Sequence, residues 1–118
     1  GVKSDSQIHE ITKTAGNFVL NVLGKGQQGA AYAFFKPAER NGQKISGEPF
    51  HAGSTGAPIL DNMPAFIECR LVTTVEEGDH SIFLGEVVDA GVNQEPEGRA
   101  DDATLLLKDL GEKTYYGG

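Results

Sequence analysis

Hydrophobic and polar residues alternate most regularly in the centre of the chain, from Ala65 to Val75. Because successive side chains of a strand point to opposite sides, this alternation places Cys69 on an apolar face and Glu68 on a polar face. A second apolar run, Ser81 to Val88, follows the polar residues Glu76–Asp79. Two long strands joined by a short Gly–Asp turn predict an antiparallel hairpin.

The N-terminal segment has the pattern of a short helix. Ser4 and Gln7 have the spacing of a capping box, in which side chains bind the unpaired backbone N–H groups of the first turn. Ile8 and Ile11 follow at helical spacing, and Gly16 supplies a stop signal. We therefore expect a helix that begins near Ser4 and ends before Gly16.

The remaining elements are shorter and are separated by glycine-rich turns. The apolar run Phe18–Leu23 predicts a strand covered on both faces, and Gln27–Lys36 predicts a second helix. The polar stretch Ala90–Asp102 is expected to be a solvated loop, followed by a final strand, Thr104–Leu107. This order predicts a mainly β fold with α-helices, a small barrel or α+β sheet, in one domain over residues 1–118.

Composition narrows the classes of function. The chain has 118 residues, 10 Lys and Arg against 17 Asp and Glu, and a net charge of -7. This acidic balance argues against nucleic acid or an anionic membrane as a partner, and no apolar run approaches the ~20 residues of a membrane span. One cysteine, Cys69, allows no internal disulfide and fits a reducing cytoplasm. One Cys and three separated His residues do not suit a structural zinc site.

Two small groups of residues could carry chemistry. Lys3, Ser4 and Ser6 lie at the start of the first predicted helix, where free N–H groups and the helix dipole favour a phosphate. The alternative is an ordinary helix cap beside a solvated lysine. His80 follows Asp79 in the hairpin turn and could donate a hydrogen bond or a proton to a ligand. The alternative is a turn histidine paired with Asp79.

Other candidate motifs are weaker. Gly24–Gly29 fits G-x-G-x-x-G, but no buried strand leads to the acidic residue Glu48, so we interpret the motif as a plain turn. Cys69 is expected to be a buried small hydrophobe rather than a nucleophile. His9 and His51 are expected to be structural or solvated.

Five short segments stand in a recognisable order along the chain. The fifth carries Gly-Asp-His followed by Phe-Leu-Gly-Glu-Val, similar to a GDHxxFLGxV signature. Together the five resemble the flavin reductase-like, FMN-binding split-barrel family, and their order and spacing agree with that family from about Val2 to Val92. The segments are Phe18–Leu23, Lys44–Gly47, Gly56–Leu60, Glu68–Arg70 and Gly78–Val87.

The resemblance implies a Greek-key split β-barrel that forms a homodimer, holds FMN near the dimer interface and reduces flavin with NADH or NADPH. Lys3, Ser4 and Ser6 match the segment that meets the flavin phosphate in the family. His80 matches the histidine near the flavin and nicotinamide, and is the expected catalytic residue. The expected cofactor-binding residues are Lys3, Ser4, Ser6, Asn21, Asp79 and His80.

The chain also departs from the family pattern. Ser6-Gln7-Ile8 stands where an S-x-T sequence is more usual. No segment similar to N-S-F-x-S-V-S-x-x-P-P precedes Val2, so we expect a member shortened at its N-terminus, or a fragment, without the N-terminal strands. Two alternatives to a reductase stay open: a non-catalytic flavin-binding or structural split-barrel domain, and a shortened domain that binds no flavin.

Overall fold

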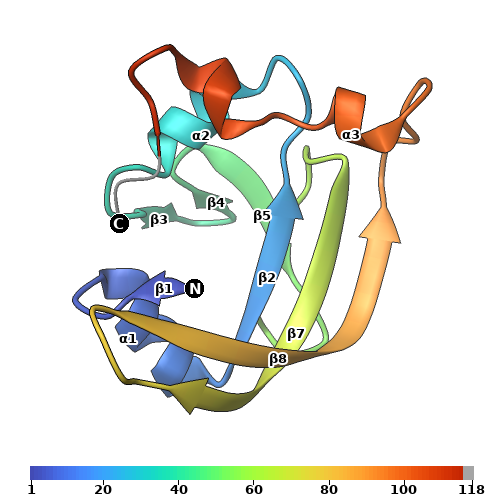
Figure 1. Ribbon diagram of the computed structural model, residues 1–118. Helices are drawn as coiled ribbons and strands as arrows, with labels where there is room; N and C mark the ends of the chain where they lie inside the picture. The colour runs from blue at the N-terminus through green and yellow to red at the C-terminus, as the bar shows by residue number, and fades with distance from the viewer. Residues whose placement is uncertain (116–118) are drawn as a thin grey trace.

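The computed structural model describes residues 1–115 of the chain, and it confirms a mainly β fold with short helices (Figure 1). Residues 116–118 of the predicted domain lie outside the described part. The elements, in order, are β1 (Val2–Lys3), α1 (Gln7–Ala15), β2 (Asn17–Val22), α2 (Gln28–Ala33), β3 (Arg40–Asn41), β4 (Lys44–Ile45), β5 (Glu48–Ala52), β6 (Pro58–Leu60), β7 (Ala65–Val75), β8 (His80–Val92), α3 (Ala100–Ala103) and a 3-10 helix, Leu107–Leu110.

The strands form two four-stranded antiparallel sheets, ordered β1-β8-β7-β2 and β3-β4-β5-β6. The predicted hairpin is confirmed as β7 and β8, and β8 extends to Val92, so the start of the predicted loop is strand. β8 bends along the lower edge of the molecule in Figure 1 before it rises beside β7. Gly85 of β8 permits close packing against β2 and β7, because a Cβ there would lie 2.6 Å from Phe18 Cζ and 2.9 Å from Cys69 Cβ.

The prediction that Glu68 lies on a polar face of β7 is wrong. The pairing of β7 with β8 shifts register between Glu68 and Cys69. A β-bulge interrupts the alternation of side chains, and both residues are buried. The prediction of a buried Cys69 is confirmed, whereas Glu68 becomes a fully buried carboxylate.

Helix α1 begins later than the sequence predicts. Its N-cap is Ser6, whose Oγ accepts a hydrogen bond from the His9 amide at 3.3 Å. Ile8 and Ile11 are 58% and 53% exposed, while His9 and Thr12 face inward. The helix therefore packs through a polar side, because the strand it meets presents the hydroxyl of Ser81.

The predicted strand Thr104–Leu107 is also wrong. Thr104 makes a single bridge to Gly24, and a 3-10 helix follows. The Leu106 amide donates to Asp109 Oδ2 at 2.8 Å, and Asp109 is held by Lys25 at 2.6 Å. A side chain that satisfies the backbone in this way competes with strand pairing.

The apolar core is small and lies between α2 and the β5–β6 hairpin. Ala30, Leu60 and Met63 are buried there, with Leu23 and Phe50 packed against them. Helix α2 is shorter than predicted and ends at Ala33. In residues 1–115, no helix has both the length and the apolar character needed to cross a membrane.

Candidate functional site

The structure brings the N-terminal segment and the hairpin turn together. β1 pairs with the start of β8, so that Lys3 lies opposite His80 and Val2 lies opposite Ser81. The Ser4 amide donates to the Asp79 carbonyl at 2.9 Å, and the Ser4 hydroxyl donates to the same oxygen at 2.6 Å. These contacts gather residues that are more than 70 positions apart in the sequence.

The second serine of this group caps the helix. The Ser6 hydroxyl donates to the Lys3 carbonyl at 2.7 Å and accepts from the His9 amide. The hydroxyl hydrogens of Ser4 and Ser6 are therefore both directed at backbone carbonyls of this chain. Ser4 thus holds the turn before the helix and Ser6 caps the helix, while their part in binding a phosphate stays a prediction.

The donors left for an anion are a lysine and backbone amides. Lys3 is half-exposed, and its ammonium lies 3.9 Å from a carboxylate oxygen of Asp5, a loose ion pair. The first turn of a helix has amides without intrahelical acceptors. The backbone amides of Gln7 and Ile8 donate no hydrogen bond to a turn carbonyl or a side chain in the described part of the chain. The donors at the start of α1 are therefore one positive side chain and two backbone amides, with Asp5 as an opposing charge.

His80 is oriented by its neighbour. Its Nδ1 lies 3.2 Å from Asp79 Oδ1, while the Asp79 side chain is almost fully exposed. The hydrogen bond from His80, the charge of His80 and, more weakly, the charge of Lys3 hold the pKa of the Asp79 carboxyl below its ordinary value. Asp79 thus stays ionised and fixes the ring of His80 at the edge of this group.

Asn21 does not join the other predicted residues. It lies on β2, where its Nδ2 donates to the Pro58 carbonyl at 3.3 Å and its Oδ1 accepts from the Leu60 amide at 2.9 Å. These bonds connect β2 to β6, so the side chain joins the two sheets. The five residues Lys3, Ser4, Ser6, Asp79 and His80 form one group, hereafter the N-terminal site.

Sequence reasoning missed a buried polar pair under the N-terminal site. His9 Nε2 and Ser81 Oγ share a hydrogen bond of 2.8 Å, and both side chains are buried. The prediction that His9 is structural or solvated is resolved in favour of a structural role. His51, in contrast, is exposed and pairs with Asp61 at 2.6 Å.

The buried Glu68 was missed as well. Its two carboxylate oxygens accept four hydrogen bonds, from the amides and hydroxyls of Ser54 and Thr55. The Thr55 hydroxyl and amide, together with those of Ser54, hold the pKa of Glu68 below its ordinary value. The Glu-Cys-Arg segment belongs to the family resemblance, but nothing in its pattern signals that the glutamate anchors the loop between β5 and β6.

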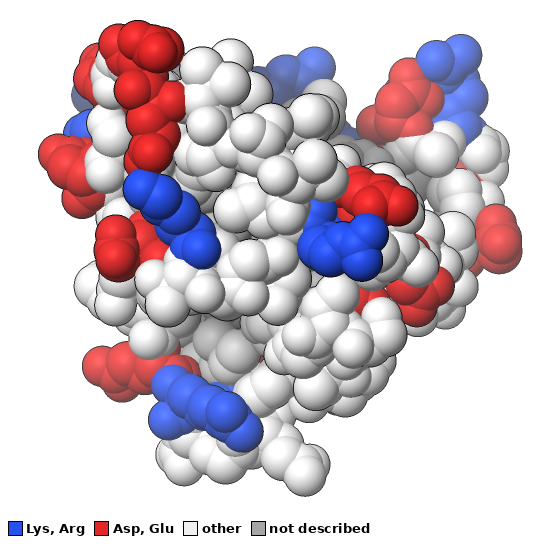
Figure 2. Space-filling view, turned by 90° about the horizontal axis from the view of Figure 1, so that it is seen from below, with Lys and Arg blue, Asp and Glu red and all other residues white. Residues whose placement is uncertain are grey.

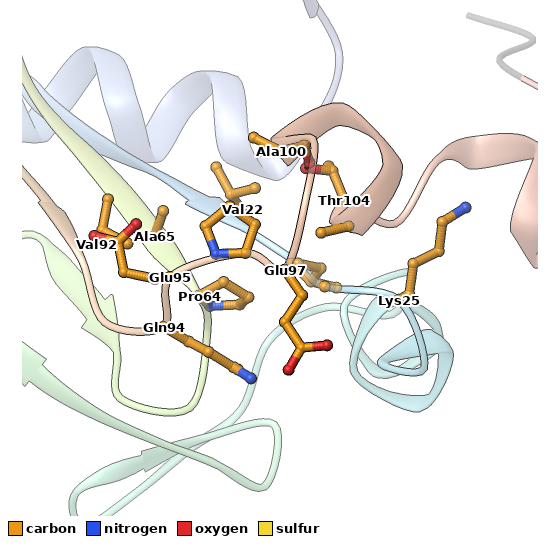
Figure 3. Close-up of a pocket in the computed structure, with 14 residues that line it drawn as sticks. Val22, Lys25, Pro64, Ala65, Val92, Gln94, Glu95, Glu97, Ala100 and Thr104 are labelled. Carbon is orange, nitrogen blue, oxygen red and sulfur yellow. The ribbon is translucent and has the colours of Figure 1, made fainter.

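A cleft of about 560 Å³ opens at the other end of β8 (Figure 3). Its lining includes the apolar residues Val22, Pro64 and Val92 and two glutamates, Glu95 and Glu97. The Lys25 amine points away from the other lining side chains and binds Asp109. None of the N-terminal site residues lines this cleft, and the two glutamates in its lining do not suit a phosphate.

The face on the side of α1 and β8 is mostly uncharged in Figure 2, with acidic and basic side chains in small separate groups. Within residues 1–115, no group of three or more His, Cys, Asp or Glu side chains could hold a metal ion.

Comparison with known proteins identifies relatives of the chain. Residues 1–113 match the family described as flavin reductase like domain. The chain is 36% identical over 93 residues to a flavin reductase of Pseudomonas putida, covering 79% of this chain and 49% of that protein. It is 30% identical over 88 residues to the FMN reductase (NADH) RutF of Pseudomonas syringae, covering 75% and 49%.

Solved structures show the same fold. The NADH:FAD oxidoreductase SgcE6 of Streptomyces globisporus superposes with a TM-score of 0.64 at 32% identity, over 77% of this chain and 55% of that one. The predicted split-barrel fold class is thereby confirmed. The chain spans a quarter to a half of the length of the first curated relatives that it matches.

Proposed function

Because the chain belongs to the flavin reductase like domain family, we propose that it binds a flavin and takes part in hydride transfer from NADH or NADPH to that flavin. The observation that carries the proposal is the register of β1 on β8, which sets Lys3 beside His80. Relatives named as an NADH-dependent FMN reductase and an NADH-dependent FAD reductase support a flavin as the ligand. We propose FMN rather than FAD, because FMN carries a single phosphate and the N-terminal site offers donors for a single phosphate.

The phosphate is assigned to Lys3 and the first turn of α1. The ammonium of Lys3 and the amides of Gln7 and Ile8 are the donors at this end of the helix. The dipole of α1 adds positive potential there. Ser4 and Ser6 support the phosphate site indirectly. Their hydroxyls donate to the Asp79 and Lys3 carbonyls and so fix the backbone of this segment.

His80 is proposed as the catalytic residue. When bound, the flavin supplies the acceptor for a hydride. An imidazole at the start of β8 orients the nicotinamide by hydrogen bonding or steadies negative charge that develops during transfer. Asp79 keeps that ring in place through its contact with Nδ1.

We also propose a homodimer in the cytoplasm. Val75 pairs with Ile82, and Leu84 lies two residues further along β8, so these three side chains share one face of the hairpin. They are between 46% and 62% exposed, and an apolar strand face of this kind favours association. The single free cysteine, which is buried, supports a reducing compartment.

The non-catalytic alternative predicts binding without turnover. The names of the relatives favour the reductase. The test is to mix the purified protein with FMN and follow flavin absorption under anaerobic conditions. Bleaching with NADH or NADPH, faster than without protein, supports the proposed function. Bound flavin that neither nucleotide bleaches supports the non-catalytic alternative, and no bound flavin refutes both.

A further inference from the structure

The buried pair of His9 and Ser81 connects the two halves of the N-terminal site. His9 belongs to α1, and its Nε2 lies 2.8 Å from the Ser81 Oγ of β8. Ser81 is 0% exposed and His9 is 4% exposed. The hydrogen bond between these two side chains connects helix α1 to strand β8.

His9 and Ser81 each adjoin a residue of the proposed flavin site, either through a hydrogen bond or along the chain. The His9 amide donates to the Ser6 hydroxyl oxygen, and this bond caps the first turn of α1. Ser81 follows His80 directly and pairs with Val2, the neighbour of Lys3. A displacement of His9 would move the first turn of α1 relative to both Lys3 and His80.

The surroundings of the imidazole fix its orientation. The Phe83 ring lies 4.9 Å from it, centroid to centroid, at a tilt of 48°. Glu76 Oε1 lies 3.7 Å from His9 Nε2, and Lys13 holds that carboxylate with contacts of 2.9 and 3.0 Å. An apolar side chain at position 9 would leave the buried Ser81 hydroxyl without this partner, which is costly in a protein interior.

We propose that His9 is a positioning residue for the flavin phosphate. It sets the first turn of α1 against β8 through Ser81, and so fixes the amides of Gln7 and Ile8 relative to Lys3. The inference rests on the proposed function, because it concerns the same site. His9 should therefore affect binding of the phosphate end of the ligand and not binding of the ring.

The test compares two ligands that differ only in the phosphate. Dissociation constants for FMN and riboflavin are measured by flavin fluorescence quenching for the wild type, His9→Ala, His9→Gln and Ser81→Ala. Loss of the positioning hydrogen bond is expected to weaken FMN about five- to tenfold in His9→Ala and Ser81→Ala, and to leave riboflavin within about twofold. Gln carries an amide at the reach of Nε2, so His9→Gln should recover most of the FMN affinity.

Two controls sharpen the result. Ile11→Ala changes an exposed side chain of the same helix and should alter neither constant. The double variant His9→Ala/Ser81→Ala should be no weaker than either single variant, because both remove the same bond. If His9→Ala does not fold, Ser81→Ala and His9→Gln carry the comparison.

The outcomes separate the inference from the proposed function. Equal weakening of FMN and riboflavin would show a general structural role and overturn the inference, as would unchanged FMN affinity in Ser81→Ala. Either result leaves the proposed function standing if the wild type binds FMN. A wild type that binds neither flavin overturns both.

Discussion

A methyl group added at Gly53 tests how tightly the buried Glu68 carboxylate is held. A Cβ at Gly53 would lie 2.2 Å from Glu68 Oε2 and 2.9 Å from Oε1. The Gly53 amide is itself bonded to the Ala57 carbonyl at 2.9 Å, which restrains the loop. Neither side can yield freely, because the carboxylate already accepts bonds from Ser54 and Thr55.

The expected size of the effect follows from that overlap. Contacts below 3.0 Å do not occur for real Cβ atoms, so the loop or the carboxylate must move by about 0.8 Å. Overpacking of this kind costs about 1–3 kcal/mol, and we expect the upper half of that range because the displaced group is charged. The reduced entropy of the unfolded chain offsets about 0.4–1 kcal/mol. Gly53→Ala should therefore lose about 1–2.6 kcal/mol, which lowers Tm by about 4–10 °C at about 4 °C per kcal/mol.

The assay is thermal and urea unfolding followed by circular dichroism, with Gly29→Ala as the matched control. Gly29 lies in α2, and a Cβ there meets nothing within 4 Å. The control should gain about 0.5–1 kcal/mol, because alanine favours the helix over glycine. A Gly53→Ala variant within 2 °C of the wild type, or a control that falls as far, would refute this account of the loop.

Four further measurements address the site and its surroundings. Lys3→Ala should weaken FMN binding by about 1–3 kcal/mol if the contact to the phosphate is charge-assisted; equal affinities of Lys3→Ala and the exposed control Lys44→Ala in a titration would remove Lys3 from the site. His80→Ala should keep FMN bound and slow hydride transfer on the order of tenfold in stopped flow; a lower Tm with an unchanged rate would assign His80 only to anchoring the turn through Asp79. The pKa of Glu68 is lower in the folded chain, so its carboxylate adds stability above about pH 4.3, the unfolded value, that is lost as the pH falls through the folded value. Glu68→Gln should shrink the change in urea midpoint between pH 7 and pH 3, and an unaltered change would contradict the assignment. Light scattering at micromolar concentration should give twice the mass of the chain, and a monomer alone would refute the dimer.

The sequence predicts elements well where one physical signal dominates. Alternation over Ala65–Val75 and the Gly-Asp turn after it specify the β7–β8 hairpin. The stop at Gly16 is found because a left-handed residue ends α1, with φ of 74°. The grouping of Lys3 with His80 came from the family resemblance, since local patterns contain no information on the pairing of β1 with β8.

The failures occur where tertiary contacts override local preference. Ile8 and Ile11 have helical spacing, yet the buried side of α1 is set by the bond from His9 to Ser81. Glu68 is buried because a loop distant in sequence supplies its donors. Asn21 lies in a family motif and connects two sheets through contacts that the motif does not signal, and its part in cofactor binding stays a prediction.

The attachment of residues 104–110 has a consequence for local unfolding. This segment is held by the Lys25–Asp109 ion pair, the hydrogen bond that Tyr32 donates to the Leu110 carbonyl, and the bridge from Thr104 to Gly24. The Lys25 and Asp109 side chains are 45% and 21% exposed, and a partly exposed ion pair contributes modest free energy. The segment should therefore open independently of the sheets and at lower cost. Its amides should exchange with deuterium before those of β7, and limited proteolysis should cut there first. Raising the salt concentration should speed that cleavage by screening the ion pair, while the central hairpin stays protected.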